Sequence, residues 1–264
     1  MSQLAGTPGM VLNRPGGAGA IAADTVLAAP LETGSLLLSG LDAIAYSHLN
    51  SGRRPLDPFV DFAPVASASR DTWLLVVPHG SRFKSVADLV GAPKDPPLNY
   101  ASSGEGSTPH LVAARFARDL GIRAVHVPYK QSYLPDLIAG RIDFVIAPTP
   151  AMLPQVRGGK LRVLSSLTDE RLAVLEGVPT IRELGRPDQV FYGGLFIFAP
   201  AGLSARAGQI NDWLLATIRQ PAIRARFHDA GIETVEQDVE EVRHAMAERL
   251  RTVAAMREAV FGRT

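Results

Sequence analysis

The chain contains no cysteine, which excludes disulfide bonds, thiol nucleophiles and thiolate metal ligands. An excess of one charge is also lacking, because 27 basic residues balance 26 acidic ones and the formal net charge is +1. Aromatic residues make up only 6%, and no patch of mixed basic and aromatic residues indicates a nucleic-acid partner. No apolar run approaches the length that crosses a bilayer.

Hydrophobic residues, by contrast, occupy 46% of the 264 positions, and charged residues occupy 20%, which is typical of a folded protein with a large core. Segments with strand character alternate with segments of helical periodicity, and this alternation predicts an α/β fold with mainly parallel sheets. Ligands of such sheets bind beyond the carboxyl ends of the strands. The candidate ligand loops are therefore the turns after predicted strands, at 39–42, 102–107, 128–131 and 147–150.

The expected elements follow from apolar periodicity and from the positions of glycine and proline. Strands are expected at 10–12, 35–39, 62–69, 73–77, 98–101, 124–127, 142–146, 161–167 and 233–235, with a long buried strand at 191–199. Helices are expected at 20–29, from about 42, at 85–90, from about 108, and at 132–139, 149–156, 204–219, 221–230 and 239–260.

The stretch at 99–110, Asn-Tyr-Ala-Ser-Ser-Gly-Glu-Gly-Ser-Thr-Pro-His, is the central candidate site. A strand, a turn of small residues and the start of a helix together present unpaired N–H groups at the positive end of a helix dipole, which favours a carboxylate or phosphate. The other reading is an ordinary turn before a helix capped by Ser107 or Thr108. The candidate ligand residues of this turn are Ser102, Ser103, Gly104, Gly106 and Ser107.

Catalytic patterns are weak in this sequence. The six histidines show no spacing typical of zinc ligands, and no serine lies between glycines as in a nucleophile elbow. Ser81 and Lys84 have a Ser-x-x-Lys spacing, a short pattern that recurs by chance. His110, one turn into the helix after the turn, is the one candidate general base, and its alternative role is a local hydrogen bond. We predict no catalytic residue and no bound metal.

A partial dinucleotide-binding fingerprint occurs at 17–22, with Asp42 at a suitable distance beyond it. The glycines of this segment follow Pro15 and do not come directly from a strand. The alternative is a helix start whose glycines permit close packing. We therefore predict no nucleotide and no other cofactor.

Nine short motifs, in a fixed order along nearly the whole chain, are similar to the Bug family, the solute-binding proteins of tripartite tricarboxylate transporters. They are Asn-Arg-Pro-Gly-Gly-Ala-Gly at 13–19, Asp-Phe-Ala-Pro-Val at 61–65, Asn-Tyr-Ala-Ser-Ser-Gly at 99–104, His-Val-Pro-Tyr-Lys at 126–130, Gly-Gly-Lys-Leu-Arg at 158–162, Val-Pro-Thr at 178–180, Ala-Pro-Ala-Gly at 199–202, Arg-Phe at 226–227 and Ala-Gly at 230–231.

The resemblance implies a two-lobed periplasmic-binding-protein (type II) fold, in which each lobe is a mainly parallel sheet flanked by helices. Lobe one is expected to comprise residues 1–77 plus 196–264, and lobe two residues 78–195. In such a fold the lobes close on a ligand, here a small organic carboxylate. The implied partner is the membrane permease of a tripartite transporter, and the implied location is the periplasm.

Ligand residues outside the central turn are implied by the same resemblance. Ser39 and Gly40 would face the ligand from lobe one, although a simple strand-end turn capped by Asp42 is the alternative. Tyr129 would supply a wall and a donor, and Thr149 a further hydroxyl. Lys130, beside Tyr129, is either a ligand contact or a solvated surface charge.

The chain departs from the family pattern in three places. Its first residue matches the end of the family's first helix, so the usual signal peptide, first strand and first ligand loop are expected to be lacking. The segment 147–149 has no acidic residue, and Gln131 replaces a usual glycine. An alternative function follows from the lack of a signal peptide: a repurposed cytoplasmic relative that acts on a carboxylate as a sensor, an interaction protein or an enzyme.

Overall fold

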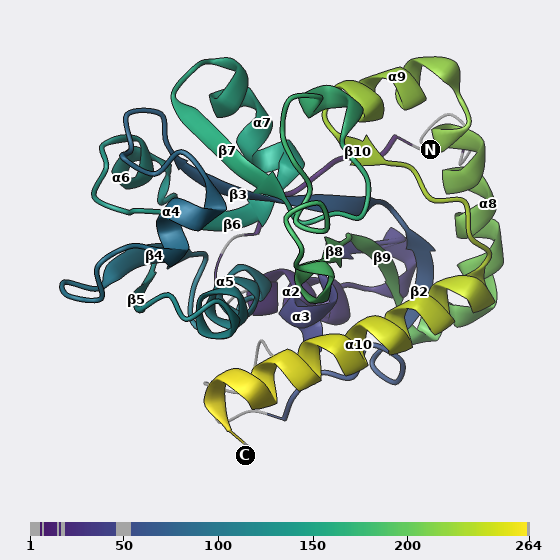
Figure 1. The fold of residues 1–264 in the computed structure, drawn as a ribbon. Helices are drawn as coiled ribbons and strands as arrows, with labels where there is room; N and C mark the ends of the chain where they lie inside the picture. The colour runs from purple at the N-terminus through teal and green to yellow at the C-terminus, as the bar shows by residue number, and fades with distance from the viewer. Residues whose placement is uncertain (1–5, 7, 15, 17–18, 46–53, 263–264) are drawn as a thin grey trace. The chain divides into compact units, whose positions relative to one another are not determined.

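The computed structural model describes residues 6, 8–14, 16, 19–45 and 54–262 as a mixed α/β fold (Figure 1). Contacts within the chain divide it into two compact units, which are described separately below. The functional lobes predicted at 1–77 with 196–264 and at 78–195 stay a prediction. Unit 1 comprises Met1–Arg70, Gly194–Phe227 and Glu233–Thr252, and unit 2 comprises Asp71–Gly193, His228–Ile232 and Val253–Thr264.

Unit 1 is built on a three-stranded antiparallel sheet in which β9 (Phe196–Pro200) lies between β1 (Leu37–Ser39) and β2 (Phe62–Ser67). All six residues of β2 are buried, because apolar side chains cover both faces of the sheet. Alanines and Val65 of β2 pack on one face against α8 (Ala207–Ile218). Side chains on the other face pack in a second cluster, which includes Ala23, Val26, Leu37, Ile44, Phe62, Phe198, Val242 and Met246.

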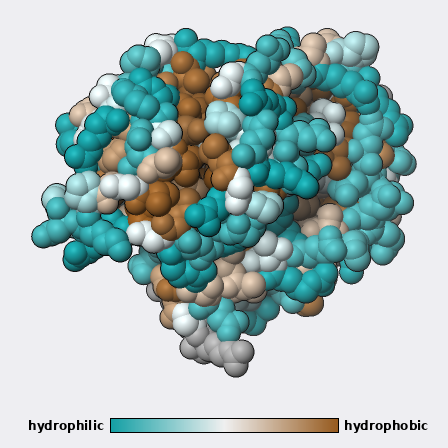
Figure 2. All heavy atoms as spheres, in the orientation of Figure 1, coloured by the Kyte–Doolittle hydropathy of each residue, from teal (hydrophilic) through white to brown (hydrophobic). Residues whose placement is uncertain are grey.

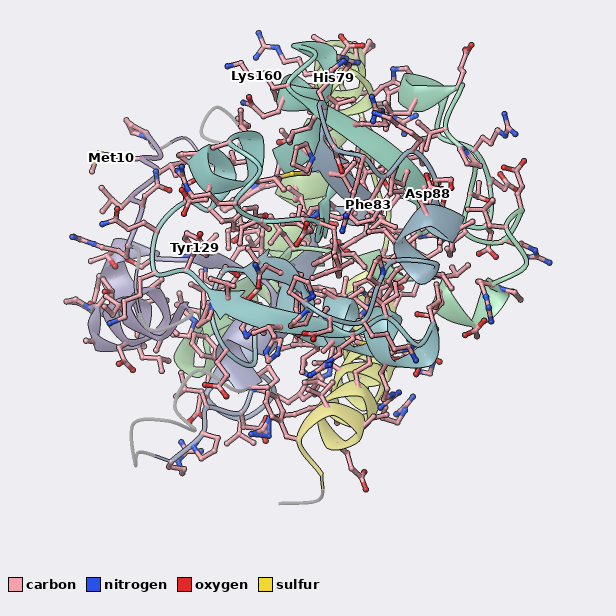
Figure 3. The ribbon with its side chains drawn as sticks, turned by 60° about the vertical axis from the view of Figure 1, so that its left-hand side comes forward. Met10, His79, Phe83, Asp88, Tyr129 and Lys160 are labelled. Atoms are coloured by element: carbon pink, nitrogen blue, oxygen red, sulfur yellow. The ribbon has the colours of Figure 1, made fainter. Side chains whose placement is uncertain are left out.

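In unit 2 the long strand β3 (Arg70–Pro78) pairs antiparallel with β6 (Val145–Pro148), β7 (Leu161–Ser166) and β8 (Tyr192–Gly193). The far ends of β3 and β7 remain joined beyond the strands, because the His79 N–H donates to the Lys160 carbonyl at 3.0 Å (Figure 3). Residues 74–77 of β3 are fully buried. This strand is therefore the core of unit 2.

A second, smaller sheet of unit 2 carries the central stretch. Strand β4 (Leu98–Ser102) pairs in parallel with β5 (Ala124–Pro128), and α5 (Thr108–Asp119) connects them. An isolated parallel bridge joins Tyr100 to Phe144, just before β6. The helices that complete the unit around these sheets are α4 (Val86–Val90), α6 (Leu134–Ile138) and α7 (Thr149–Arg157).

The predicted parallel pairing is confirmed for β4 and β5, which are neighbours both in the chain and in the sheet. The described pairs of β3 and β9, however, are antiparallel. Alternation of helices and strands predicts parallel pairs only when consecutive strands become neighbours. Strands β3 and β9 instead pair with segments from distant parts of the sequence, so the alternation carries no information on their direction.

Two other expected strands differ in the structure. Residues 10–12 form no regular element, and their side chains are exposed, so their apolar character does not mark a buried strand. The long strand expected at 191–199 is interrupted between β8 and β9. A Cβ on Gly193 would lie 2.2 Å from Trp73 Nε1, and one on Gly194 would lie 2.6 Å from the Ser69 carbonyl oxygen. Only glycine allows the backbone to pass so close to these groups, and the chain leaves one sheet for another there.

The remaining helices agree closely with the expected pattern. Helix α4 begins with a capping box, in which Ser85 and Asp88 bond reciprocally to each other's backbone (Figure 3). The segment predicted as one helix at 204–219 begins as a 3₁₀ turn and becomes helix α8 at Ala207. The other elements are α2 (Ala20–Ala28), α3 (Leu41–Ala45), α9 (Pro221–Asp229), β10 (Ile232–Glu233), α10 (Val239–Phe261) and the 3₁₀ turns Leu31–Thr33, Ala173–Leu175, Pro187–Gln189 and Ala201–Arg206.

The surface is largely hydrophilic over α8 and α9, whereas hydrophobic residues gather over β3 and β7 of unit 2 (Figure 2). Within the described ranges, no helix combines the length and apolar character that a membrane span needs.

Candidate functional site

The central stretch folds into a bend of small residues, 102–107, between β4 and α5. Ser107 is the N-cap residue of α5, and Pro109 lies in its first turn, where a missing N–H costs nothing. Leu111, Val112 and Phe116 anchor the helix because their side chains are buried. The first turn holds no acidic residue, so the positive end of the helix dipole is not neutralised there.

Two serine hydroxyls of the bend point inward and bond to the bend itself. Ser107 Oγ donates to the Gly104 carbonyl at 2.7 Å, and Ser102 Oγ lies 2.9 Å from the same oxygen. The Gly104 N–H in turn lies 3.2 Å from Ser102 Oγ. Of the two expected cap residues, Ser107 occupies the N-cap position, but its hydroxyl donates to the Gly104 carbonyl and does not accept from an N–H of the helix. Both hydroxyls therefore shape the bend.

The groups left to meet a ligand are different ones. Ser103 and Glu105 are exposed, and within the part of the chain that the structure describes no partner accepts from their N–H groups. Gly104 and Gly106 have φ angles of +130° and +77°, which an L-residue adopts only with strain. These two glycines let the bend turn Ser103 and Glu105 outward. The donors of these exposed residues without a partner in the described part of the chain are thus the Ser103 hydroxyl and two backbone amides.

A layer of flat rings lies directly beneath the bend. His110 and His126 stack with their ring centroids 3.7 Å apart and their planes within 7°. Tyr100 stacks on His126 at 5.2 Å and on Phe144 at 5.6 Å. His110 Nδ1 accepts the Gly106 N–H at 3.0 Å, and His126 Nε2 lies 2.7 Å from Ser102 Oγ. The layer therefore supports the bend through polar atoms as well as through packing.

Both imidazoles are held neutral. Burial and, to a smaller extent, the nearby His126 together lower the pKa of His110 to about 4. The pKa of His126 is also lowered by burial, although the charge of Glu105 opposes this shift. Because His110 Nδ1 accepts a hydrogen bond, its proton is on Nε2. Such a weak base is poorly suited to the general-base role considered for His110.

Because the pKa of His110 is low in the folded chain, the free energy of unfolding changes with pH in a definite direction. The unfolded chain binds a proton at His110 near pH 6.5, whereas the folded chain binds it only near pH 4. The stabilising contribution is therefore complete above pH 6.5 and is lost as the pH falls towards 4. We expect the stability of the wild type relative to His110→Asn to decrease across this window, measured by urea unfolding at pH 7.5, 6 and 5. An unchanged difference would contradict the neutral assignment.

Tyr129 follows β5 and is tied to the bend, because its N–H donates to the Ser102 carbonyl at 3.0 Å (Figure 3). Its phenol donates to Asp136, which raises the pKa of Tyr129 and lowers that of Asp136. The carboxylate of Asp136 also accepts from Arg141. The phenol is thus engaged with α6, while Lys130 is exposed.

Thr149 opens α7 and is fully buried. Its hydroxyl donates to the Thr72 carbonyl at 3.0 Å and lies 2.7 Å from the Thr72 hydroxyl, so it fastens α7 to β3. The structure thus brings together the predicted residues of 102–107 and the backbone of Tyr129. The Thr149 hydroxyl, at the start of α7, instead forms hydrogen bonds with Thr72 of β3.

The predicted residues of unit 1 are Ser39, which ends β1 opposite Phe196, and Gly40 after it. Both are half-buried, and their part in binding stays a prediction. The side chain of Asp42 and residues 17–18 of the partial dinucleotide fingerprint lie outside what the structure describes.

His126 and Tyr100 were not singled out as functional by sequence reasoning. Their proximity depends on the register of the parallel pair β4 and β5, which sets Tyr100 opposite His126. A surface pocket of about 440 Å³ also exists in unit 2, lined by Pro78, Gly80, Ser81, Arg82, Phe83, Ile138, Ala139, Gly140, Ile142 and Asp143. None of the predicted site residues lines that pocket.

Sheets flanked by helices are the architecture of periplasmic binding proteins, the fold class that the resemblance implies. A family model described as "Tripartite tricarboxylate transporter family receptor" matches residues 1–260. The chain belongs to this family of receptors. The resemblance described above is thereby confirmed, and the protein is a receptor rather than an enzyme.

Individual relatives agree with the family assignment. A UPF0065 protein from the tcbD-tcbE intergenic region of Pseudomonas sp. (strain P51) is 30% identical over 240 residues, which cover 89% of this chain and 71% of the relative. A solved structure of a periplasmic transporter is 26% identical, with a TM-score of 0.87 over 96% of this chain and 86% of the other. R. palustris Rpa4515 with adipate is 28% identical, with a TM-score of 0.85 over 97% of this chain and 88% of the other.

Proposed function

We propose that this protein captures a small organic carboxylate in the periplasm and delivers it to the membrane permease of a tripartite tricarboxylate transporter. Family membership supports the receptor role. The relative with bound adipate supports a carboxylate as the ligand class, and the relative described as a periplasmic transporter supports the location. The alternative, a repurposed cytoplasmic relative, is not favoured, because the family that matches residues 1–260 is described as a transporter receptor.

The observation that carries this proposal is the outward set of donors on the bend at 102–107. A carboxylate there would accept from the Ser103 hydroxyl and from the N–H groups of Ser103 and Glu105. Hydrogen bonds to a charged acceptor contribute roughly 1.5–3 kcal/mol each. The helix dipole of α5 adds to this attraction, and the Glu105 side chain must point away from the ligand.

The remaining predicted residues have separate parts in the proposal. Ser102 and Ser107 hold the bend in shape, and Gly104 and Gly106 permit its backbone conformation. Tyr129 and Thr149 supply support from neighbouring elements of unit 2, and Ser39 and Gly40 are candidate ligand contacts of unit 1. Single alanine variants of Ser39, Tyr129 and Thr149 test each of these parts in the same binding assay.

Calorimetric titration with adipate and with its neutral diamide, adipamide, tests the proposal. The charged acid is expected to bind with a measurable heat and the diamide is not, because only the acid offers carboxylate acceptors. Failure of a panel of mono-, di- and aromatic carboxylates to bind would refute the proposed function.

The variant Ser103→Ala is expected to weaken carboxylate binding by about tenfold, because it removes one hydrogen bond to a charged acceptor, worth roughly 1.5 kcal/mol or more. Calorimetry at pH 7.5 measures this change. The matched control is Ser204→Ala, an exposed serine of unit 1. Equal affinities of the Ser103 variant and the wild type would remove the hydroxyl from the site.

A further inference from the structure

The stacked imidazoles beneath the bend hold its two glycines through different ring atoms. His110 Nδ1 accepts the Gly106 N–H at 3.0 Å. His126 Nε2 lies 2.7 Å from Ser102 Oγ, the same oxygen that lies 3.2 Å from the Gly104 nitrogen. Each of the two positive-φ residues of the bend is therefore linked to one histidine, directly or through a single serine.

Packing alone does not explain this choice of residues. Two apolar rings would fill the same space without the cost of removing imidazole nitrogens from water. The cost is offset here because the nitrogens meet polar groups of the bend. His110 is only 5% exposed, and its one acceptor nitrogen is directed at the Gly106 amide.

Aromatic side chains pack against the two rings, and one carboxylate acts on His126. Tyr100 of β4 stacks on His126, and Phe261 of α10 meets His110 edge-on at 5.4 Å. Arg257, also of α10, lies over the ring of Phe261, with 5.5 Å between its guanidinium carbon and the ring centroid. Glu105, on the bend, is the acidic group whose charge acts on His126.

We propose that His110 and His126 are positioning residues of the carboxylate-binding bend, with His110 Nδ1 fixing the Gly106 amide and His126 Nε2 fixing Gly104 through Ser102. This inference rests on the proposed function of the bend. It assigns the histidines a role in ligand affinity that acts through the bend.

The test compares three replacements of His110. In His110→Asn the side-chain oxygen takes the place of Nδ1 and still accepts the Gly106 N–H. In His110→Gln an acceptor of the same kind lies one bond further out, and in His110→Phe the ring remains without any acceptor. A positioning role predicts adipate affinity within threefold of the wild type for Asn, and a loss of tenfold or more for both Gln and Phe.

A role in packing alone predicts the opposite order, with His110→Phe binding best and His110→Asn worst. That order, measured by calorimetry at pH 7.5, would overturn the inference. The variant His244→Asn on the exposed side of α10 serves as the control and is expected to bind like the wild type. The corresponding pair for the other ring is His126→Gln, which retains a hydrogen-bonding group near the position of Nε2, and His126→Phe, which does not.

Amide hydrogen exchange in the absence of ligand separates this inference from the proposed function. The Gly106 N–H is expected to exchange slowly in the wild type and in His110→Asn, and at least tenfold faster in His110→Gln and His110→Phe. Equal exchange rates in all four proteins would refute the positioning role even if carboxylates bind. The other informative outcome is slow exchange of the Gly106 N–H only in the proteins that retain the acceptor, in a protein that binds no carboxylate. This result would refute the proposed function but would support the assigned hydrogen bond.

Discussion

Truncation of Phe144 to alanine is expected to lower the free energy of unfolding by about 3–5 kcal/mol, the range for removing a large aromatic side chain from a core. Phe144 is completely buried and stacks on Tyr100 at 5.6 Å. It also bridges to β4 just before β6 begins. The cavity would therefore open between the two sheets of unit 2.

Urea unfolding monitored by circular dichroism measures this loss. The control is Phe261→Ala, because that ring is 40% exposed at the end of α10 and its removal is expected to cost less than about 1.5 kcal/mol. Similar losses for the two variants would show that the ring layer of unit 2 is not the centre of its stability.

Replacement of Gly106 by alanine is expected to weaken carboxylate binding by tenfold or more. Its φ of +77° costs an L-residue about 1–2 kcal/mol, and no atom lies within 4 Å of the added Cβ, so the whole effect comes from the backbone. Relief of that strain rotates the neighbouring peptides. The Gly106 amide then leaves His110, and the outward amide of Glu105 changes direction.

Gly121→Ala is a closely matched control for this variant. Gly121 ends α5 with a φ of +69°, and space around its added Cβ is equally open. Both variants should therefore lose similar stability in urea, while only the bend variant should lose affinity in calorimetry. A loss of affinity in both, or in neither, would contradict the assignment of the bend as the binding element.

Much of the fold could be predicted from local pattern. The strand, the Ser/Gly turn and the helix start at 98–119 were recognisable because the spacing of the apolar residues, the glycines and Pro109 all indicate the same structure. The break at Gly193 and Gly194 was not, since both glycines lie in an apolar run that is continuous in the sequence. The break is caused by Trp73 and Ser69, more than a hundred positions earlier, and no local pattern reports such a contact.

The sequence predicts a position for the candidate site but not the role of each residue in it. Small residues at 102–107 predict a bend with donors, yet they do not show which hydroxyl points inward. The direction of each hydroxyl depends on the Gly104 carbonyl, which accepts hydrogen bonds from Ser107 Oγ and Ser102 Oγ in the folded bend. The pairing of Tyr100 with His126 depends on the register between β4 and β5, which a single sequence does not specify.

The inward hydrogen bonds of the bend have a kinetic consequence for the receptor. Ser102, Ser107 and the two histidines satisfy the internal polar groups before any ligand arrives, so the bend is preorganised. Under the proposed function, little conformational entropy is then lost when a carboxylate associates, and the amides do not have to be rearranged to bind it. Substitutions that loosen the bend should accordingly shorten the residence time of the bound metabolite far more than they slow its arrival.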